Sequence, residues 1–354
     1  MIMAMMKQLK LVGPKQLVME SVPVPEPGKG EVLIKVAAVG VCGSDLTIYR
    51  GHHPYAISPL VMGHEFAGTI AACGKGVKGR VIGGRVAVIP HLVCGVCKAC
   101  KAKVFNFCES LRCMGAEAHG AHAEYIAVPA VMAVPMEAGV SWNMAAMLEP
   151  ACVGYHGARR EKIGRKTRAL IVGAGPIGNF CMQTVKAMGA ERVLMADLDD
   201  DRLDLAVKLG ADGVIRLKKE SLKEGAIRCD VPLKDMDVFY DCVGLKGQVL
   251  DQMIGHARRG TGIVVIGVLQ NGYSIPKLPD FVQHELRLSG STMYTPRDYR
   301  DMITLMSQGK VRIDGVITHT VTLEQVPELL GAMDRGEFRG FKVIVTLGDE
   351  ERPA

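Results

Sequence analysis

The sequence predicts an α/β protein of two domains, a mainly β domain and a doubly wound parallel sheet. Three observations predict this fold class. The chain has 354 residues, a length typical of about two domains. Before residue 150 the apolar runs are short and separated by glycine and proline, as in irregular β structure. After Arg165, strand-like runs alternate with helical patterns, which indicates a parallel sheet with helices on both faces.

The elements follow in order along the chain. In the first domain, β-branched residues cluster at 32–36 and 85–89 and predict strands there. In the second, the buried-strand pattern 169–172 precedes a glycine-rich turn and a helical pattern over 179–188. Further strands are expected at 192–197, 238–241, 263–266 and 286–288, and helices at about 201–209 and 297–308. The final β-like run, 341–346, is expected to return to the first domain.

Composition and charge exclude several classes of function. Lys+Arg 43 against Asp+Glu 37 gives a net charge of +6 without a run of five like charges, so no nucleic-acid partner is expected. One of the two longest uncharged stretches, 169–185, is interrupted by three glycines and a proline, so no membrane span is expected. The start of the chain lacks the basic and apolar regions of a signal peptide. We therefore expect a cytoplasmic protein.

A glycine motif in the second half predicts a phosphate-binding turn. Gly173, Gly175 and Gly178 follow a predicted strand and open a predicted helix, and Asp197 lies 19 residues beyond the last glycine at the end of the next strand. This context is the dinucleotide fingerprint, in which the helix amino terminus receives the phosphates. The Asp197 carboxylate would accept hydrogen bonds from the ribose hydroxyls and would repel a 2′-phosphate, which favours NAD over NADP. The alternative is a glycine-rich turn without a ligand. The expected cofactor-binding residues are Gly173, Gly175, Pro176, Ile177, Gly178, Asp197 and Arg202, the last of which could instead pair with the adjacent aspartates.

Four of the eleven cysteines fall within fifteen residues, at Cys94, Cys97, Cys100 and Cys108. This spacing supplies the four thiolates of a closed tetrahedral zinc site, which leaves no position open for chemistry. We therefore expect a structural zinc in a lobe at about 90–113. The alternative is a set of buried thiols without a metal. Cys113, five residues further on, is expected to be a bystander.

A dispersed set of residues carries a resemblance to a known family. The set consists of six short motifs of this chain: Cys42-Gly-Ser-Asp45, Gly63-His-Glu-Phe-Ala-Gly68, the four-cysteine lobe, Gly120-Ala-His-Ala-Glu-Tyr125, Glu149-Pro-Ala-Cys-Val-Gly154 and Gly173-Ala-Gly-Pro-Ile-Gly178. In order and spacing they resemble the zinc-containing medium-chain dehydrogenase/reductase family across nearly the whole chain. The resemblance implies a GroES-like catalytic domain over 1–155 and 292–354 and a Rossmann NAD-binding domain over 156–291. It also implies a homodimer or homotetramer.

Within that family the chain looks most like the polyol branch, which includes sorbitol, galactitol and threonine dehydrogenases, because Glu149 stands where ethanol-type enzymes have cysteine. The resemblance implies that Cys42 and His64 bind a catalytic zinc, with Glu65 and Glu149 as water-mediated or exchanging ligands. Cys152 falls at a non-ligand position. Two zinc ions per chain are thus expected. Ser44, two residues after the first ligand, is expected to take the substrate's hydroxyl proton.

Three positions depart from the family pattern. Thr47 stands where related enzymes often carry a histidine, and His52, His53 or Tyr55 could replace it in passing on the proton. Sorbitol-type members carry an Arg-Tyr pair near the substrate, whereas this chain reads Met293-Tyr294. Gly83-Gly84-Arg85 replaces the common Gly-Asp-Arg, so a local salt bridge is expected to be missing.

The expected reaction is NAD-dependent oxidation of a secondary alcohol on a polyol, a sugar alcohol with or without a phosphate, or a sugar acid, giving a ketone. Zinc with an open position would lower the pKa of the substrate hydroxyl, and the nicotinamide would accept the hydride. L-threonine 3-dehydrogenase activity is the first alternative. A non-catalytic zinc- and NAD-binding protein is a second, although every expected site residue is present. A zinc-free quinone-reductase-like enzyme is disfavoured because that branch lacks both cysteine sites.

Overall fold

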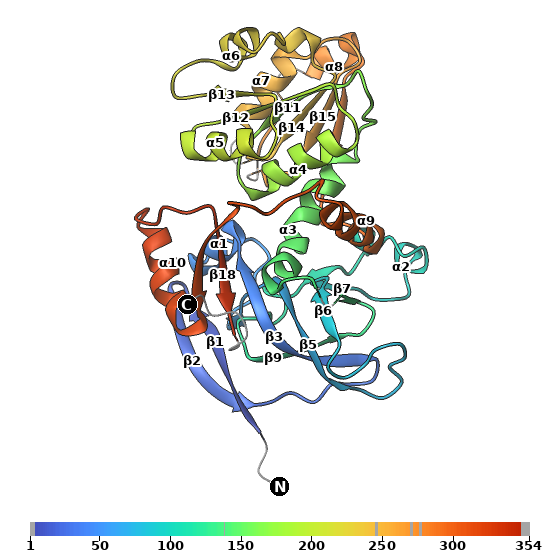
Figure 1. The fold of residues 1–354 in the computed structure, drawn as a ribbon, viewed down its shortest axis with the longest axis vertical. Helices are drawn as coiled ribbons and strands as arrows, with labels where there is room; N and C mark the ends of the chain where they lie inside the picture. Colours follow the sequence, from blue (N-terminus) through green and yellow to red (C-terminus); the bar gives the residue numbers. More distant parts are fainter. Residues whose placement is uncertain (1–3, 138, 245–246, 270–271, 276–277, 348–354) are drawn as a thin grey trace. The chain divides into compact units, whose positions relative to one another are not determined.

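The computed structural model describes residues 4–137, 139–244, 247–269, 272–275 and 278–347. The chain divides into two compact units, each described here by itself (Figure 1). The first consists of Met1–Glu149 with Ile317–Ala354, and the second of Pro150–Val316. None of the described helices is both long and apolar enough to cross a membrane.

The first unit is built mainly of β-strands with short helices. Its elements are β1 (Met5–Gly13), β2 (Gln16–Pro23), β3 (Glu31–Val41), α1 (Gly43–Tyr49), β4 (Leu60–Val61), β5 (Glu65–Cys73), β6 (Arg85–Val88), β7 (His91–Leu92), α2 (Lys98–Lys101), β8 (Arg112–Cys113), β9 (Tyr125–Pro129), β10 (Ala133–Pro135), β17 (Ile317–Thr322), α10 (Val326–Asp334) and β18 (Lys342–Thr346). Helix α3 (Trp142–Ala158) contains the boundary between the units.

Strand β3 is the centre of the larger sheet of this unit, whose order is β10-β6-β5-β3-β18-β17 with β9 also paired to β3. Val32, Ile34 and Val36 of β3 are buried, so its side chains form part of the core. The expected return of the chain is confirmed, because β18 pairs antiparallel with β3 (Figure 1). Smaller sheets, β2-β1-β4 and β7-β8, complete the described strands of the unit.

Arg85, for which a missing salt bridge was expected, makes other contacts. Its guanidinium donates to the Val140 carbonyl at 2.8 Å. The guanidinium carbon lies 3.4 Å from the centre of the Trp142 ring. A cation stacked on an aromatic face is attracted to the ring's negative face, which holds the start of α3 against β6.

The second unit alternates strands and helices. Its elements are β11 (Arg168–Val172), α4 (Pro176–Ala187), β12 (Arg192–Asp197), α5 (Asp200–Lys208), β13 (Gly213–Arg216), α6 (Leu222–Arg228), β14 (Val238–Asp241), α7 (Gln248–His256), β15 (Gly262–Val265), α8 (Leu278–His284), β16 (Arg287–Gly290) and α9 (Pro296–Ser307). The strands form one parallel sheet in the order β13-β12-β11-β14-β15-β16. This arrangement is the doubly wound sheet that the sequence predicts.

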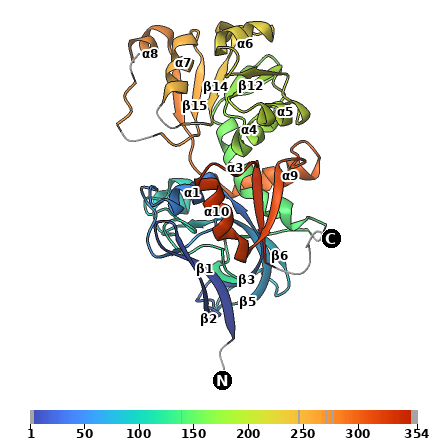
Figure 2. The same ribbon diagram turned by 90° about the vertical axis from the view of Figure 1, so that its left-hand side faces the viewer.

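Apolar side chains of the sheet pack against helices on both faces. Leu170 and Val172 of β11 belong to a core cluster that also contains residues of α6 and α7. Figure 2 shows α4 and α5 together beside β12. After β11 the chain continues to β12 and β13 on one side of the sheet, and after β14 it continues to β15 and β16 on the other side. The loops that follow β11 and β14 therefore diverge. Such a switch point is where open α/β sheets bind ligands.

The boundaries of the compact units differ from the expected domain ranges. Residues 292–316, which the resemblance places with the catalytic domain, group with the second unit. Contacts between α9 and α3 explain this grouping: the His156 ring lies 2.8 Å from the Asp298 carboxylate, and the Tyr155 hydroxyl donates to Asp301 at 3.1 Å. The residues that return to the first sheet therefore begin at Ile317.

Candidate active site

Three potential metal ligands gather where β3 ends and β5 begins. Cys42 follows β3 and caps the amino terminus of α1, His64 directly precedes β5, and Glu65 is the first residue of that strand. Because β3 and β5 are antiparallel neighbours, the end of one lies beside the start of the other. One ligand atom from each residue lies within 4.8 Å of the others. The sequence-predicted trio is thus brought together.

Ser44 and Asp45 hold His64 from two sides. The Ser44 Oγ lies 3.5 Å from Nε2 of His64, and the Asp45 carboxylate lies 3.6 Å from Nδ1. Asp45 is itself fixed, because its other oxygen accepts the Cys42 backbone N–H at 2.8 Å. Burial disfavours a charged His64, but Asp45 outweighs this effect and holds the pKa of His64 well above 6.5. A carboxylate behind an imidazole orients the ring and makes it a better metal ligand.

Glu65 has a partner that the motifs do not reveal. Nζ of Lys342 on β18 donates to both Glu65 carboxylate oxygens at 2.7 Å and to the Val41 carbonyl at 3.1 Å. Both side chains of the pair are almost fully buried. Burial disfavours the Lys342 ammonium, yet the Glu65 carboxylate overcomes this and raises the pKa of Lys342. Gly40 leaves room for the pair, because a Cβ there would lie 2.0 Å from a Glu65 oxygen.

Glu149 is not part of the group of three gathered ligands. It is 5% exposed on α3 and is not among the residues whose ligand atoms fall within 4.8 Å of one another in the described chain. Its charge contributes to raising the pKa of Lys342, which indicates that the two side chains lie in one region of the first unit. A direct ligand role for Glu149 remains a proposal.

Gly63 and His122 stand in two of the sequence motifs, and the structure brings these two residues into contact. Gly63 has φ +92° and precedes His64; a Cβ there would lie 2.8 Å from the His122 ring. His122 is fully buried, and within the described structure neither of its ring nitrogens has a hydrogen-bond partner. Burial lowers the pKa of His122, so the ring stays neutral. The close packing explains the glycine of the Gly63-His-Glu sequence.

The donor set fits zinc. A thiolate, an imidazole nitrogen and a carboxylate are the ligand types that zinc takes, and three protein ligands leave a fourth position for a substrate. Cys42, His64 and Glu65 supply these types at the required proximity. The orientation of His64 by Asp45 supports the same assignment.

The four cysteines of the predicted lobe also come together, with their sulfur atoms within 4.8 Å of one another. The Sγ of Cys94 lies 3.9 Å from that of Cys100 and 3.7 Å from that of Cys108. Zinc–sulfur bonds of about 2.3 Å in a tetrahedron place sulfurs about 3.8 Å apart, so the cluster has the size of a zinc site. Backbone N–H groups of Cys100 and Glu109 lower the pKa of Cys97 to about 6, which favours the thiolate that binds metal.

Cys113 and Cys152 are two of the six cysteines that lie outside both clusters. Cys113 is buried, and its S–H group donates to the Met114 carbonyl at 3.3 Å. Burial raises the pKa of Cys113 to about 12, so it stays a thiol, in agreement with its expected role as a bystander. Cys152 is buried within α3 and does not belong to either group of gathered ligands in the described chain.

The glycine motif forms the turn between β11 and α4. Gly173 has φ +100°, which favours glycine, and its N–H donates to the Ala196 carbonyl at 2.8 Å. A Cβ at Gly178 would lie 1.8 Å from the Gly173 oxygen, so this close packing requires glycine. Gly175, by contrast, has no protein atom within 4 Å of a Cβ position. Its missing side chain leaves space beside the amino terminus of α4, where phosphates bind. The turn therefore fits a dinucleotide.

Asp197 ends β12 beside this turn. Its carboxylate accepts the Ala174 N–H at 2.6 Å and the Asp199 N–H at 2.9 Å, which fix its orientation. Arg202 pairs locally, with its Nε 3.8 Å from the Asp199 carboxylate.

Tyr294 belongs to the Met293-Tyr294 sequence that stands in place of the Arg-Tyr pair of sorbitol-type enzymes. It is fully buried, and its ring lies 5.7 Å from that of Tyr299.

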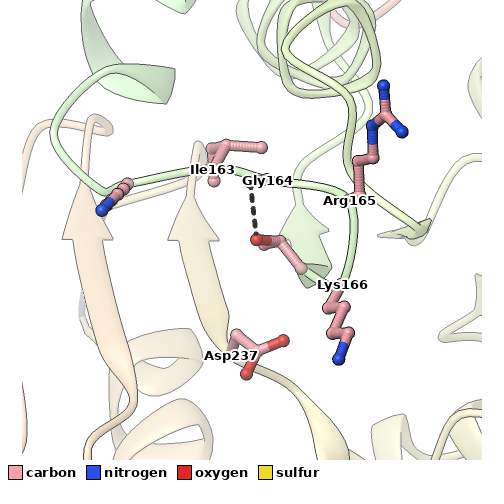
Figure 3. Close-up of a pocket in the computed structure, with 7 residues that line it drawn as sticks. Ile163, Gly164, Arg165, Lys166 and Asp237 are labelled. Carbon is pink, nitrogen blue, oxygen red and sulfur yellow. Dashed lines mark hydrogen bonds between the residues drawn. The ribbon is translucent and has the colours of Figure 1, made fainter.

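A hollow of about 420 Å³ lies beside the starts of the central strands β11 and β14 (Figure 3). It is lined by the loop before β11, including Arg165 and Lys166, and by Asp237. The loop closes on itself because the Gly164 N–H donates to the Thr167 Oγ at 2.9 Å (Figure 3). The hollow lies at the start of β11, whereas the glycine turn lies at the end of β11. The hollow is therefore not the dinucleotide site.

Comparison with known proteins agrees with this fold and site. Residues 28–138 match the family described as alcohol dehydrogenase GroES-like domain, and residues 176–308 match the family described as zinc-binding dehydrogenase. The chain therefore belongs to the zinc-binding medium-chain dehydrogenase family. Within that family it is an NAD(P)-dependent zinc alcohol dehydrogenase of the polyol and sugar-acid branch, acting on CH–OH donors.

Individual relatives cover nearly the whole chain. L-idonate 5-dehydrogenase of Vitis vinifera is 32% identical over 89% of this chain and 87% of its own. L-threonine 3-dehydrogenase of Mesorhizobium japonicum is 33% identical over 90% of this chain and 92% of its own. The crystal structure of the short chain alcohol dehydrogenase rspB from Escherichia coli CFT073, complexed with NADH, is 30% identical, covers 97% of this chain and 100% of its own, and has a TM-score of 0.89.

Proposed function

We propose that the protein oxidises a secondary alcohol of a polyol, sugar alcohol or sugar acid to a ketone and transfers the hydride to NAD. The observation that carries the proposal is the meeting of Cys42, His64 and Glu65 with the Ser44 hydroxyl beside them. A site of this kind presents both a Lewis-acid position and a hydroxyl that can hold a proton. NAD rather than NADP is favoured because Asp197 ends β12, and a carboxylate at the end of this strand would repel the 2′-phosphate of NADP.

The residues of the chain have distinct tasks in this reaction. Zinc, when bound by Cys42 and His64, lowers the pKa of the substrate hydroxyl, as it does for water. Ser44 Oγ receives the hydroxyl proton and passes it toward solvent. Asp45 orients His64, and Lys342 holds the Glu65 carboxylate in place.

The cofactor is held by the second unit. NAD, when bound, supplies the acceptor for the hydride. Gly175 leaves room for the pyrophosphate at the α4 amino terminus, and Asp197 accepts hydrogen bonds from the adenosine ribose. We propose that Glu149 serves as a water-mediated or exchanging ligand of the same metal as Glu65.

The test measures NADH formation with a panel of alcohols, with and without a chelator. The panel contains sorbitol, galactitol, xylitol, inositols, sugar phosphates, aldonic acids and L-threonine. Cys42→Ala is expected to abolish turnover and to lower the zinc content from two to one per chain. Cys73→Ala, which alters an exposed cysteine of the same unit, is the matched control and is expected to keep both. Full activity of Cys42→Ala would refute the proposed mechanism.

L-threonine is the second candidate substrate, and the identity to the Mesorhizobium enzyme supports it. Turnover on L-threonine alone would make it the substrate. A protein that binds two zinc ions and NAD but turns over no alcohol of the panel would favour the non-catalytic alternative.

We also propose a homodimer or homotetramer. Strand β16 ends the described parallel sheet, and its Leu288 is 38% exposed, so the strand offers unpaired backbone groups and apolar surface to a second copy. Light scattering of the purified protein measures the mass directly.

A further inference from the structure

The segment after α1 contains three side chains that could act on a molecule bound near the metal ligands. These side chains differ in their exposure to solvent. His53 is partly buried, whereas His52 is exposed and Tyr55 is 71% exposed. Thr47, which stands in the usual histidine position, donates its hydroxyl to the Gly43 carbonyl at 3.2 Å within α1. Of these four residues, His53 is the one whose ring is partly withdrawn from solvent and able to act on a bound molecule.

The hydrogen bond of His53 defines its tautomer. The backbone N–H of Tyr55 donates to Nδ1 of His53 at 3.3 Å, so Nδ1 carries a lone pair and Nε2 carries the proton of the neutral ring. The Tyr55 ring packs edge-on against the imidazole, with centroids 6.2 Å apart. Burial lowers the pKa of His53, although Glu117 opposes this effect. Near neutral pH, His53 therefore offers an uncharged N–H donor.

Glu117 comes to the same place from a different part of the chain. The Ile57 N–H donates to the Ala116 carbonyl at 3.0 Å, so the two segments lie side by side. Glu117 is anchored because one of its carboxylate oxygens accepts the Cys113 N–H at 3.1 Å. It is only partly buried, which leaves carboxylate surface for a ligand.

Both segments are held against the metal-ligand strand. A Cβ at Gly115 would lie 2.8 Å from the backbone of Gly63, the residue before His64. The charges of Glu117, His64 and Asp45 all act on His53, which indicates that these side chains share one region of the first unit. A donor and an anionic acceptor thus stand near the ligands of the proposed catalytic metal.

We propose that His53 and Glu117 form a subsite that binds hydroxyl groups next to the one being oxidised, and that this subsite selects neutral polyols over aldonates and sugar phosphates. The inference rests on the proposed function and names its substrate class. A hydroxyl group both donates and accepts, so it satisfies Glu117 and the Nε2–H of His53 together. A carboxylate or phosphate in that position would face the negative charge of Glu117 without a compensating cation from His53.

Two cations of the same unit are already paired. Arg50 donates to the Asp334 carboxylate at 2.6 Å, and Lys342 is committed to Glu65. Neither is free to neutralise an anionic substrate beside Glu117.

The test compares xylitol with xylonate, and sorbitol with gluconate, as substrates of the zinc-loaded enzyme with NAD. Glu117→Gln retains the shape and an oxygen that can accept the Cys113 N–H but removes the charge. It is expected to raise KM for the polyols about tenfold, because hydrogen bonds to charged groups are among the stronger ones. It is also expected to lower KM for the aldonates, while kcat changes little. His53→Phe is expected to raise KM for the polyols. Glu137→Gln, which alters an exposed carboxylate of the same unit, is the matched control and is expected to leave KM for both classes unchanged.

A second readout is calorimetric titration of xylitol and xylonate into the protein loaded with NADH, where no turnover occurs. Weaker xylitol binding and stronger xylonate binding by Glu117→Gln would support the subsite. An unchanged polyol-to-aldonate preference in Glu117→Gln and His53→Phe, with both zinc ions retained, would overturn the inference alone. A wild type that prefers aldonates would also overturn it. Absence of turnover on every polyol and aldonate would instead refute the proposed function.

Discussion

The buried pair of Lys342 and Glu65 allows a quantitative test of how the site is held. Lys342→Met keeps the apolar stem of the side chain but removes the ammonium that contacts both Glu65 oxygens at 2.7 Å and the Val41 carbonyl at 3.1 Å. The pair is 3% and 1% exposed, so water cannot replace the lost partner. Removing one partner of a buried ion pair costs about 3–5 kcal/mol, because the other charge stays buried and unpaired.

The assay is urea unfolding of zinc-depleted protein, followed by tryptophan fluorescence. The chain has one tryptophan, Trp142, buried in the first unit, so the signal reports on the unit that contains the pair. Lys342→Met is expected to lower the unfolding midpoint by about 1 M or more, given slopes of about 1–3 kcal/mol per M. The double variant Glu65→Leu with Lys342→Met is expected to recover most of this loss, because a well-packed apolar pair replaces the ion pair.

The double-variant comparison also isolates the coupling between the two side chains. A midpoint for Lys342→Met equal to that of the wild type would refute the reasoning, because it would show that the ammonium contributes nothing to holding Glu65. If Lys342→Met and the double variant lose the same free energy of unfolding, the cost comes from packing rather than from the unpaired charge.

Three further predictions follow from other parts of the chain. Gly178→Ala is expected to weaken NADH binding at least tenfold, because its Cβ would lie 1.8 Å from the Gly173 oxygen; fluorescence titration with NADH measures this, and unchanged affinity would contradict it. Cys100→Ser is expected to lose the zinc of the lobe while the second zinc stays, so metal analysis should read one per chain; two would show that this thiolate is not a ligand. Burial opposes the charged form of Asp298, but hydrogen bonds from His156 and Thr295 outweigh it and lower the pKa of Asp298 from 3.8 to about 2. The Asp298 carboxylate therefore contributes stability that is fully present above pH 3.8 and is lost as the pH falls through about 2. Asp298→Asn should cost about 2 kcal/mol at pH 7 and less than about 0.5 kcal/mol at pH 2. A cost independent of pH in urea unfolding would contradict this reasoning.

The sequence alone determined the features whose geometry lies within a short segment. The four-cysteine lobe is predictable because its ligands span fifteen residues, and short loops can bring such thiolates together only in a few ways. The strand–glycine turn–helix unit is predictable for the same reason, since Gly173, Gly175 and Gly178 act on their own turn. Strand β12 and strand β14 also match the expected ranges, because buried parallel strands are continuous apolar runs.

The tertiary structure decided the features that depend on distant segments. One part of the site consists of Gly40, Glu65 and Lys342. Glu65 and Lys342 lie 277 positions apart in the sequence, and they meet only because β18 and β5 both pair with β3. The boundary at residue 316 was likewise hidden, since it depends on contacts of α9 with α3. No local pattern encodes these contacts, because burial and pairing are properties of the assembled sheet rather than of any single segment.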